Sequence, residues 1–253
     1  MGDAARRWAE LQGGRGIPPE ILAVARDDPW THQPGDFTAP DVAVATASRD
    51  AATVLLGEGG TVLDVGCGGG AAAFALDGIT AVTGVDRQRD MLELFVAAAT
   101  ARGVPHRIVP GTWPDVAGEA GAADVVLCHH VLHNVVDLPP FLRALTAAAR
   151  RGVVVEMFAE HPLAWLDPLW LRFHGLRRPP PATVDNAVAV LGELGTRTEV
   201  ARWDRVTVPR DDAAWVARRL CLPPGRTEEV AAALAELPVR PRQVATLTWP
   251  GGA

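Results

Sequence analysis

Hydrophobic positions divide most of the chain into short apolar runs that alternate with amphipathic stretches. Apolar runs of about five residues predict buried strands, whereas apolar residues at helical spacing, as at positions 91, 92, 95, 96 and 99, predict a helix. From residue 61 onward the two kinds of segment alternate, which is typical of a parallel sheet covered by helices on both faces. The strands predicted in this part are 61–65, 81–85, 106–109, 124–128 and 152–157.

The helices predicted between these strands are 71–76, 89–101 and 138–149, and one long helix, 37–56, precedes them. Towards the C-terminus the alternation changes. Thr183 is predicted to cap a helix that Gly195 ends, and 211–221 and 227–237 are also predicted helices. Segments 196–208 and 243–249 are predicted as two final strands without a simple crossover, which indicates an antiparallel end to the sheet.

The amino-acid composition excludes or disfavours several classes of function. A net charge of −6 disfavours a nucleic-acid partner. The chain contains neither Lys nor Tyr, which excludes a Schiff-base lysine and a tyrosine proton donor. Three scattered cysteines indicate reduced thiols. With no signal peptide, acylation motif or membrane-spanning stretch, we expect a cytoplasmic protein that binds no membrane.

A glycine-rich loop follows the first predicted strand, in the sequence Asp64-Val65-Gly66-Cys67-Gly68-Gly69-Gly70. Glycine lets the backbone turn sharply and approach a ligand closely, and the predicted helix that follows offers unpaired N–H groups. Asp86 lies about 20 residues further on, at the end of the second predicted strand, where a carboxylate accepts hydrogen bonds from ribose hydroxyls. The combination predicts a cofactor that contains adenosine.

The loop also matches the dinucleotide pattern G-x-G-x-x-G/A, which is a weak signal alone. Asp64 favours another cofactor, because a carboxylate beside the loop suits an ammonium group and not a pyrophosphate. The run therefore resembles motif I of class I S-adenosylmethionine-dependent methyltransferases, (Asp/Glu)-x-Gly-x-Gly-x-Gly. The resemblance covers roughly residues 37 to 249. It implies an α/β fold, with a doubly wound, seven-stranded, mostly parallel sheet whose last strand is antiparallel.

By position, the resemblance implies that Asp64 approaches the methionine end of the cofactor and Asp86 holds the ribose. The other cofactor-binding residues that we predict are Gly66, Cys67, Gly68, Arg87, Met91, Gly111, Thr112, Trp113 and His129. Thr112 stands where the family often has an Asp, and Trp113 offers a stacking face in its place. Met91 is alternatively plain core, Trp113 a cover for a sheet edge, and Arg87 a solvated arginine or a 2′-phosphate binder.

Histidines follow the fourth predicted strand, where the family places residues between cofactor and acceptor. His129 is predicted to touch cofactor or substrate, and His133 to act as a base, because the unperturbed pKa of histidine is about 6.5. Their i, i+4 spacing would also suit a metal. No nearby carboxylate completes such a site, so no metal is predicted. Glu156 and His161 are further polar candidates.

Aromatic residues on both sides of the core are candidates for the walls of an acceptor pocket. The predicted substrate contacts are Trp30, Phe37, His130, Trp165 and Trp170. The helical spacing of the tryptophans is equally typical of core. Arg177 and Arg178 either bind a carboxylate or lie in solvent ahead of three prolines, and we take the second interpretation. We expect one domain, with an N-terminal helical cap over 1–56, a cofactor-binding part over 57–253 and a substrate-covering insertion near 158–182.

The function predicted from these residues is transfer of a methyl group from S-adenosylmethionine to an oxygen or nitrogen of a small organic molecule, by a monomer or homodimer. Two alternatives stay open. One is an NAD(P)-dependent oxidoreductase, disfavoured by Asp64 and by the lack of a Tyr/Lys pair. The other is a non-catalytic module that binds S-adenosylmethionine without turning it over.

Overall fold

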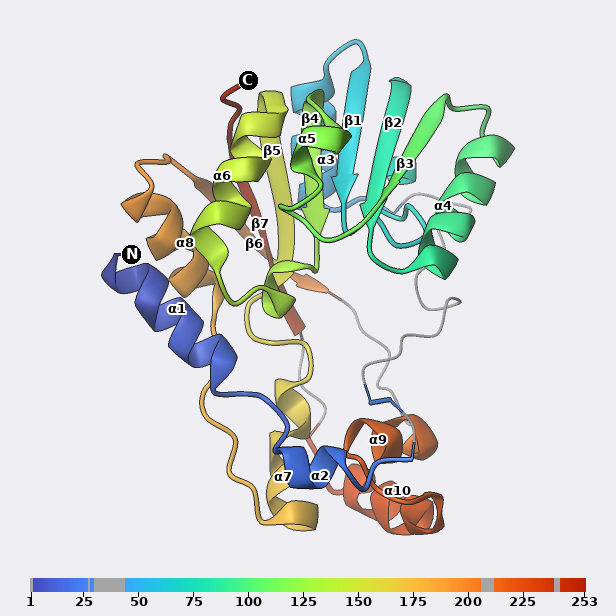
Figure 1. The fold of residues 1–253 in the computed structure, drawn as a ribbon, viewed down its shortest axis with the longest axis vertical. Helices are drawn as coiled ribbons and strands as arrows, with labels where there is room; N and C mark the ends of the chain where they lie inside the picture. Colours follow the sequence, from blue (N-terminus) through green and yellow to red (C-terminus); the bar gives the residue numbers. More distant parts are fainter. Residues whose placement is uncertain (1, 27, 30–43, 206–211, 239–241) are drawn as a thin grey trace.

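A computed structural model describes residues 2–26, 28–29, 44–205, 212–238 and 242–253 (Figure 1). Its centre is a seven-stranded sheet in the order β3-β2-β1-β4-β5-β7-β6. Strands β1 to β5 pair in parallel, and β7 runs antiparallel to both β5 and β6. The predicted fold class is therefore confirmed. The strands are β1 Gly60–Val65, β2 Ile79–Asp86, β3 His106–Pro110, β4 Ala123–His129, β5 Ala149–Phe158, β6 Glu199–Arg205 and β7 Arg242–Pro250.

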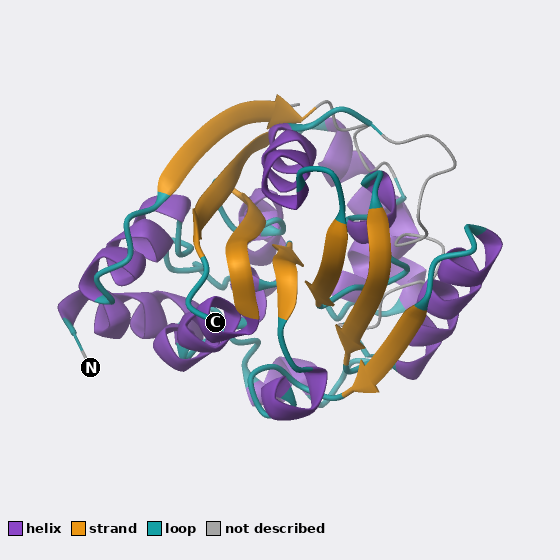
Figure 2. Cartoon of the chain, turned by 90° about the horizontal axis from the view of Figure 1, so that it is seen from above, coloured by secondary structure: helices purple, strands orange, loops and turns teal. Residues whose placement is uncertain are grey.

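Helices lie on both sides of the twisted sheet, as the view from above shows (Figure 2). One face is packed by α3 Ala47–Leu56 and α4 Arg89–Ala101, whose buried residues form a cluster with strands β1, β2, β4 and β5. The other face is packed by α5 Ala117–Ala120, α6 Leu138–Ala148 and α8 Val184–Glu193. Helix α1 Asp3–Gly13 lies against α8 and α6. The Trp8 ring on α1 is fully buried in this second cluster, and its N–H donates to the Val135 carbonyl (2.8 Å).

A group of small helices lies beyond the carboxyl ends of the parallel strands, at the bottom of Figure 1. We call this group the cap. It consists of α2 Pro19–Leu22, η4 Ala164–Leu166, α7 Asp167–His174, α9 Ala213–Arg219, η5 Pro224–Arg226 and α10 Thr227–Ala235. These helices share a separate cluster of buried residues, which includes Trp170 and Trp215. The cap therefore has a small core of its own, built from three separate parts of the sequence.

One long predicted helix begins later in the structure than the pattern indicates. Segment 37–56 is helical only from Ala47, because the Thr46 side chain caps α3 by accepting a hydrogen bond from the Arg49 N–H (3.1 Å). The prediction is thus wrong for residues 44–46, and 37–43 lie outside the described residues. The prediction for 89–101 agrees with α4 at both ends, and Thr183 forms a capping box with Asn186 at the start of α8, as predicted.

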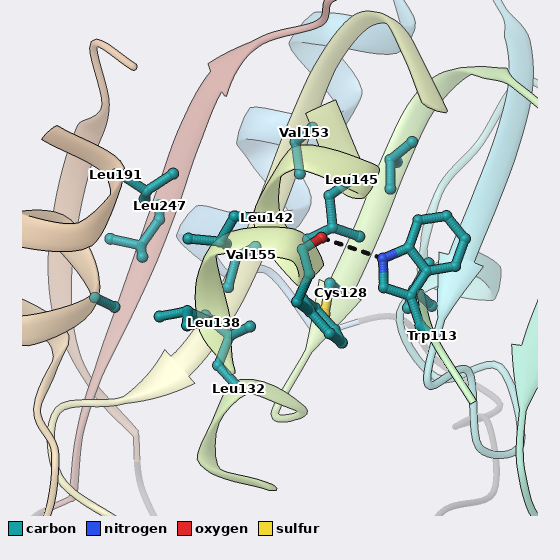
Figure 3. Packing of buried hydrophobic residues seen from close by; sticks show 14 of the residues in the cluster. Trp113, Cys128, Leu132, Leu138, Leu142, Leu145, Val153, Val155, Leu191 and Leu247 are labelled. Atoms are coloured by element: carbon teal, nitrogen blue, oxygen red, sulfur yellow. Dashed lines mark hydrogen bonds between the residues drawn. The ribbon is translucent and has the colours of Figure 1, made fainter. Parts of the chain in front are cut away.

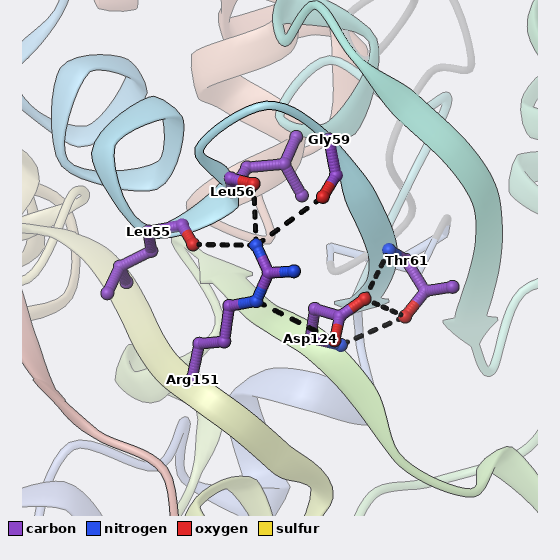
Figure 4. Close-up of polar contacts among 6 residues, drawn as sticks. All are labelled: Leu55, Leu56, Gly59, Thr61, Asp124 and Arg151. Carbon is purple, nitrogen blue, oxygen red and sulfur yellow. Dashed lines mark hydrogen bonds and ion pairs between the residues drawn. The ribbon is translucent and has the colours of Figure 1, made fainter.

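The amino ends of β1, β4 and β5 are joined by a polar cluster on the side of the sheet opposite the cap (Figure 4). Asp124 accepts hydrogen bonds from both the N–H and the hydroxyl of Thr61 (2.8 Å each). These bonds hold the pKa of Asp124 below its ordinary value. Arg151 donates to the Leu56 carbonyl (2.6 Å) at the end of α3. This cluster fixes where β1 begins, and so where its other end delivers the glycine loop.

Among the described residues, no helix combines the length and the apolar character needed to cross a membrane.

Candidate functional site

The glycine loop begins directly where β1 ends. Gly66, Gly68 and Gly70 all have positive φ angles (71°, 50° and 85°), which side chains other than glycine rarely adopt. The N–H groups of Gly66 and Cys67 both donate to the Val85 carbonyl on β2 (2.8 and 3.0 Å). The loop therefore turns back across the carboxyl edge of the sheet between β1 and β2, next to the place where the strand order reverses.

The helix predicted at 71–76 is wrong. The structure has only a single 3₁₀ turn there, η2 Ala73–Ala75, and Leu76 is already extended. The Phe74 ring lies where a Cβ on Gly70 would stand (2.2 Å), so the chain closes onto the loop and does not continue as a helix. Segment 71–76 therefore offers no helix N-terminus to a ligand. The groups that remain for binding at this loop are its backbone and the two carboxylates.

Asp64 is a buried carboxylate without a charged partner among the described residues. Its side chain is 1% exposed, and its Oδ2 atom has no hydrogen-bond partner there. Burial raises the pKa of Asp64 from 3.8 to about 7, although a hydrogen bond from the Ala73 backbone opposes the shift. A buried carboxylate oxygen without a donor is costly, and a bound ammonium group would supply the missing hydrogen bond and charge. This position thus fits the cationic end of S-adenosylmethionine.

Asp86, at the end of β2, connects the loop to the next helix. Its Oδ2 accepts a hydrogen bond from the Gly68 N–H (3.0 Å), and its Oδ1 accepts one from the Gln88 N–H (2.9 Å). A carboxylate has about four acceptor positions, so two bonds leave room for both ribose hydroxyls. The side chain is partly exposed and is therefore reachable by a ligand. Asp86 therefore holds the loop in shape, and its contact with the ribose stays a prediction.

The structure separates the other predicted cofactor residues by environment. Cys67 is buried, and burial raises the pKa of its thiol, so its side chain is a neutral packing group. Met91 is buried in the first turn of α4, whereas Arg87 and Thr112 are exposed. Gly111 donates its N–H to the Asp86 carbonyl (3.0 Å), which brings it beside the loop.

Trp113 lies in the main hydrophobic cluster, where its indole N–H donates to the Phe141 carbonyl (3.2 Å; Figure 3). Packing is thus one role of this ring. Its predicted contact with the adenine, like the cofactor contacts of Cys67, Arg87, Met91 and Thr112, stays a prediction.

His129 ends strand β4 and pairs with Glu156 on β5, and His130 follows directly after the strand. His130 has a φ of 60°. Its Nε2 lies 2.9 Å from Glu156 Oε1 and 3.0 Å from Arg205 Nη1. Although burial opposes it, the hydrogen bond from His130 and the nearby positive charges lower the pKa of Glu156 to about 2. The buried Nε2 atom of His129 has no hydrogen-bond partner among the described residues, and burial lowers the pKa of His129 to about 4. His129 is therefore neutral at physiological pH.

A cavity of about 190 Å³ lies between the sheet edge and the cap. His133 lines it, 5% exposed, with neither ring nitrogen in a hydrogen bond within the described part of the chain. Burial first, and then His161 and His130, lower the pKa of His133 to about 3. Val131, two residues before His133, contacts the glycine loop: a Cβ on Gly66 would lie 2.3 Å from its Cγ2. The cavity and the loop are thus joined by one short stretch of chain.

The predicted substrate contacts fall into three groups. Trp170 is buried in the cap core and also lines the cavity. The ring is therefore both part of a hydrophobic core and part of the cavity wall. Trp165 is partly buried beside that core. Trp30 and Phe37 lie outside the described residues.

Sequence reasoning missed several residues that line the cavity, among them Gln12, Arg15 and Arg219. They come from α1, the residues just after it, and α9, and no local pattern connects these segments. Arg178 also lines the cavity and is half-buried, so the solvated interpretation is wrong for it, whereas Arg177 is exposed. Within the described residues, no three His, Cys, Asp or Glu side chains are grouped as a metal site would require.

Comparison with known proteins identifies the family. A family model described as "Methyltransferase domain" matches residues 63–155, which contain the glycine loop, Asp86 and the β4 histidines. The match confirms the resemblance of this part of the chain to the class I S-adenosylmethionine-dependent methyltransferases. The cofactor of these methyltransferases is S-adenosylmethionine, as the loop predicts.

The curated relatives of this methyltransferase include ubiquinone biosynthesis O-methyltransferases. One from Caulobacter vibrioides is 28% identical over 185 residues, covering 64% of this chain and 73% of the relative. One from Escherichia coli O9:H4 is 34% identical over 132 residues, or 50% of this chain and 55% of the relative. One from Vibrio parahaemolyticus is 39% identical over 97 residues, or 37% and 41%. The chain thus spans about half or less of the length of the last two relatives.

Solved structures share the fold of this methyltransferase. A putative methyltransferase from Bacillus halodurans has a TM-score of 0.59 at 15% identity, with 83% of this chain and 100% of that chain covered. A putative sarcosine dimethylglycine methyltransferase from Galdieria sulphuraria has a TM-score of 0.55 at 13% identity, with 98% of both chains covered. At these identities the likeness concerns the fold alone.

The conformation of Gly66 gives a first testable prediction. An alanine there would have to adopt a φ of 71° and would meet Val131, so Gly66→Ala is expected to destabilise the protein by about 1–3 kcal/mol. Thermal denaturation measures the effect. Gly118→Ala is the matched control, because nothing lies within 4 Å of the added Cβ. Val131→Ala should recover part of the loss, and equal melting temperatures for the Gly66 and Gly118 variants would contradict the described loop.

Proposed function

We propose that this methyltransferase moves a methyl group from S-adenosylmethionine to an oxygen or a nitrogen of a small organic molecule. The observation that carries the proposal is the buried Asp64 carboxylate beside the glycine loop, whose Oδ2 has no hydrogen-bond partner among the described residues. Bound there, S-adenosylmethionine supplies a methyl group already activated on a sulfonium centre. The protein has to align the acceptor atom with the methyl group and exclude water from the site. Where the acceptor carries a proton, the protein also has to provide a group that takes it.

The residues around the loop divide these tasks. Asp64 receives the ammonium group, Gly66 and Gly68 let the backbone pass beneath the cofactor, and Asp86 holds the ribose hydroxyls. The cap covers the carboxyl edge of the sheet, where it keeps water from the acceptor. The predicted substrate-covering insertion near 158–182 corresponds to η4, α7 and the segment after them. Of the predicted cap over 1–56, α2 lies in the cap, whereas α1 and α3 lie on the sheet layers.

His133 is the proposed proton acceptor. It lines the cavity, it is neutral because burial lowers its pKa to about 3, and its ring nitrogens have no partner in the described structure. A neutral imidazole accepts a hydrogen bond from an acceptor hydroxyl and takes its proton as the methyl group is transferred. We propose that His129, at the end of β4, contacts the cofactor or substrate without carrying the proton. Oxygen is the favoured acceptor atom, because the relatives named above are O-methyltransferases.

The two alternatives make different demands on Asp64. An NAD(P) oxidoreductase would place a pyrophosphate near this loop, and a buried carboxylate beside it would repel the phosphates. A non-catalytic module would bind the cofactor equally well but form no product. A substrate panel distinguishes the module from the enzyme. We further propose a cytoplasmic protein, in keeping with three free, buried cysteines, acting as a monomer or homodimer on a small molecule and not on nucleic acid or membranes.

Calorimetric titration tests the cofactor assignment. S-adenosylmethionine and its product S-adenosylhomocysteine are expected to bind saturably, and NAD(H) is not. Asp86→Ala removes a charged hydrogen-bond partner, so it should weaken binding by about 1.5–3 kcal/mol, or roughly 10- to 150-fold. Asp90→Ala is the matched control, because this side chain is exposed on α4. Binding of NAD(H) alone, or unchanged affinity in a folded Asp86→Ala variant, would overturn the assignment.

A further inference from the structure

The cavity between the sheet edge and the cap has a strongly positive lining. Three of its side chains are the guanidinium groups of Arg15, Arg178 and Arg219, and no Asp or Glu is among the described residues that line it. Buried cations are normally paired, because removing a charge from water is costly. How each arginine is compensated therefore decides what the cavity can bind.

Arg15 has its counter-ion outside the cavity lining. The side chain is 6% exposed, and it binds Asp167 through two hydrogen bonds, Nη2 to Oδ1 (2.7 Å) and Nη1 to Oδ2 (3.1 Å). Its Nη1 also donates to the Pro179 carbonyl. Arg219, on α9, donates to the Pro29 carbonyl (2.5 Å) and lies 4.8 Å from the centre of the Trp215 ring. These two arginines are held in place by the protein itself.

Arg178 is different. Its Nη2 donates to the Arg15 carbonyl, but its Nε and Nη1 atoms are buried and have no partner within the described residues. Its guanidinium lies 5.0 Å from the centre of the Trp170 ring, which holds it against the cavity. Burial, and then Arg15, lower the pKa of Arg178, and burial with these same two arginines lowers the pKa of His161 to about 4. Both pKa shifts therefore reflect the positive charge of these arginines. Asp167 does not balance this charge, because it is already bound by Arg15.

The remainder of the lining suits a flat apolar body. Leu163, Leu166 and Trp170 contribute apolar surface, and neutral His133 borders the cavity with both ring nitrogens buried and without a hydrogen-bond partner among the described residues. The 190 Å³ volume is the size of a small organic molecule and not of a macromolecular segment. A molecule with one anionic end and an apolar remainder would satisfy the buried donors and the apolar walls together.

We propose that this cavity binds a small organic carboxylic acid, with the carboxylate on Arg178 and the apolar body against Trp170. The inference rests on the proposed function, since it names the chemical class of the methyl acceptor. A carboxylate is favoured over a phosphate for two reasons. The guanidinium fork matches a planar carboxylate, and one uncompensated cation balances a single negative charge. His133 then lies in the same cavity as the bound acid, within reach of a second functional group on it.

The test compares three probes that separate charge from shape: benzoate, benzamide and inorganic phosphate. Each is titrated into the full-length protein, with binding followed by ligand-observed NMR and by the fluorescence of the tryptophans. Benzoate is expected to bind at least tenfold more tightly than benzamide, which has the same shape without the charge. Benzoate should also bind more tightly than phosphate. Equal binding of benzoate and benzamide, or preference for phosphate, overturns the proposal without depending on any variant.

Arg178→Gln and Arg177→Gln form a matched pair of neighbouring substitutions. Arg178→Gln is expected to reduce benzoate affinity about tenfold or more, whereas Arg177→Gln, at an exposed position, should leave it unchanged. Arg178→Lys keeps the charge and should retain part of the binding. Equal losses in the two Gln variants would overturn the role of Arg178.

S-adenosylhomocysteine is titrated into the same samples to separate the two proposals. If it binds normally while benzoate does not, the carboxylate site is wrong and the methyltransferase function stands. If benzoate binds and S-adenosylhomocysteine does not, the cavity binds acids but the proposed function fails, and with it the identification of the acid as a methyl acceptor.

Discussion

Asp64→Asn is expected to stabilise the free protein at pH 8 and, in the same variant, to abolish measurable binding of S-adenosylhomocysteine. Burial raises the pKa of Asp64 from 3.8 to about 7, so above pH 7 the folded protein keeps a charge that the unfolded chain would hydrate freely. A shift of about three pKa units corresponds to roughly 4 kcal/mol of unfolding free energy. Asn keeps the size and removes the charge.

The sign of this effect fixes its pH dependence. Because the folded-state pKa is the higher one, the wild-type protein loses stability as pH rises from about 4 to about 7, and the full cost is present above 7. The advantage of Asp64→Asn in melting temperature should therefore be largest at pH 8 and smaller at pH 5. Asp90→Asn, at an exposed position on α4, is the control and should change little. A destabilised Asp64→Asn variant at pH 8 would show that the buried carboxylate already has a partner.

The same pKa predicts how cofactor binding responds to pH. The ammonium group requires ionised Asp64, so wild-type affinity for S-adenosylhomocysteine should fall about tenfold per pH unit below 7. Titrations at pH 6, 7 and 8 measure this slope. A flat profile across this range would mean that Asp64 is ionised throughout and that its burial is less complete than described.

The fold was predictable from the sequence because parallel strands are continuous apolar runs, and these runs lie where the sheet has them. The glycine loop and its two carboxylates were predictable for a related reason: all three lie at or next to the ends of two successive strands. The helix expected at 71–76 was not correct, because alanine favours a helix locally whereas Phe74 folds onto the Gly70 backbone. Local propensity was overridden by a tertiary contact.

The cavity could not be predicted from the sequence in the same way. Its arginines come from the segment after α1, the segment after α7, and α9, and only the packed cap brings them together. The adjacent pair Arg177 and Arg178 shows the difficulty most clearly. The two residues have the same chemistry and the same proline neighbours, yet one is exposed and the other borders the cavity. Burial of a single long side chain depends on contacts that no local pattern encodes.

His133→Ala is expected to lower kcat by about a hundredfold or more, because a positioned proton acceptor typically contributes 10²–10⁴ in rate. His133→Gln, which still accepts a hydrogen bond but cannot take the proton, should be nearly as slow. His106→Ala is the matched control, since His106 is exposed at the start of β3 and far along the chain from the cavity. His129→Ala should raise KM more than it lowers kcat, as expected for a contact that carries no proton.

The pH profile separates this role from that of an ordinary histidine. Because burial lowers the pKa of His133 to about 3, kcat/KM for the acceptor, measured at saturating S-adenosylmethionine, should have no acid limb between pH 5.5 and 8 from this residue. An ordinary histidine would produce a limb near pH 6.5. If such a limb appears and disappears in His133→Gln, the imidazole is hydrated and the cavity is open to water during the reaction. A flat wild-type profile together with a slow His133→Gln variant therefore requires a buried, neutral proton acceptor, which is the state in which the cap holds His133.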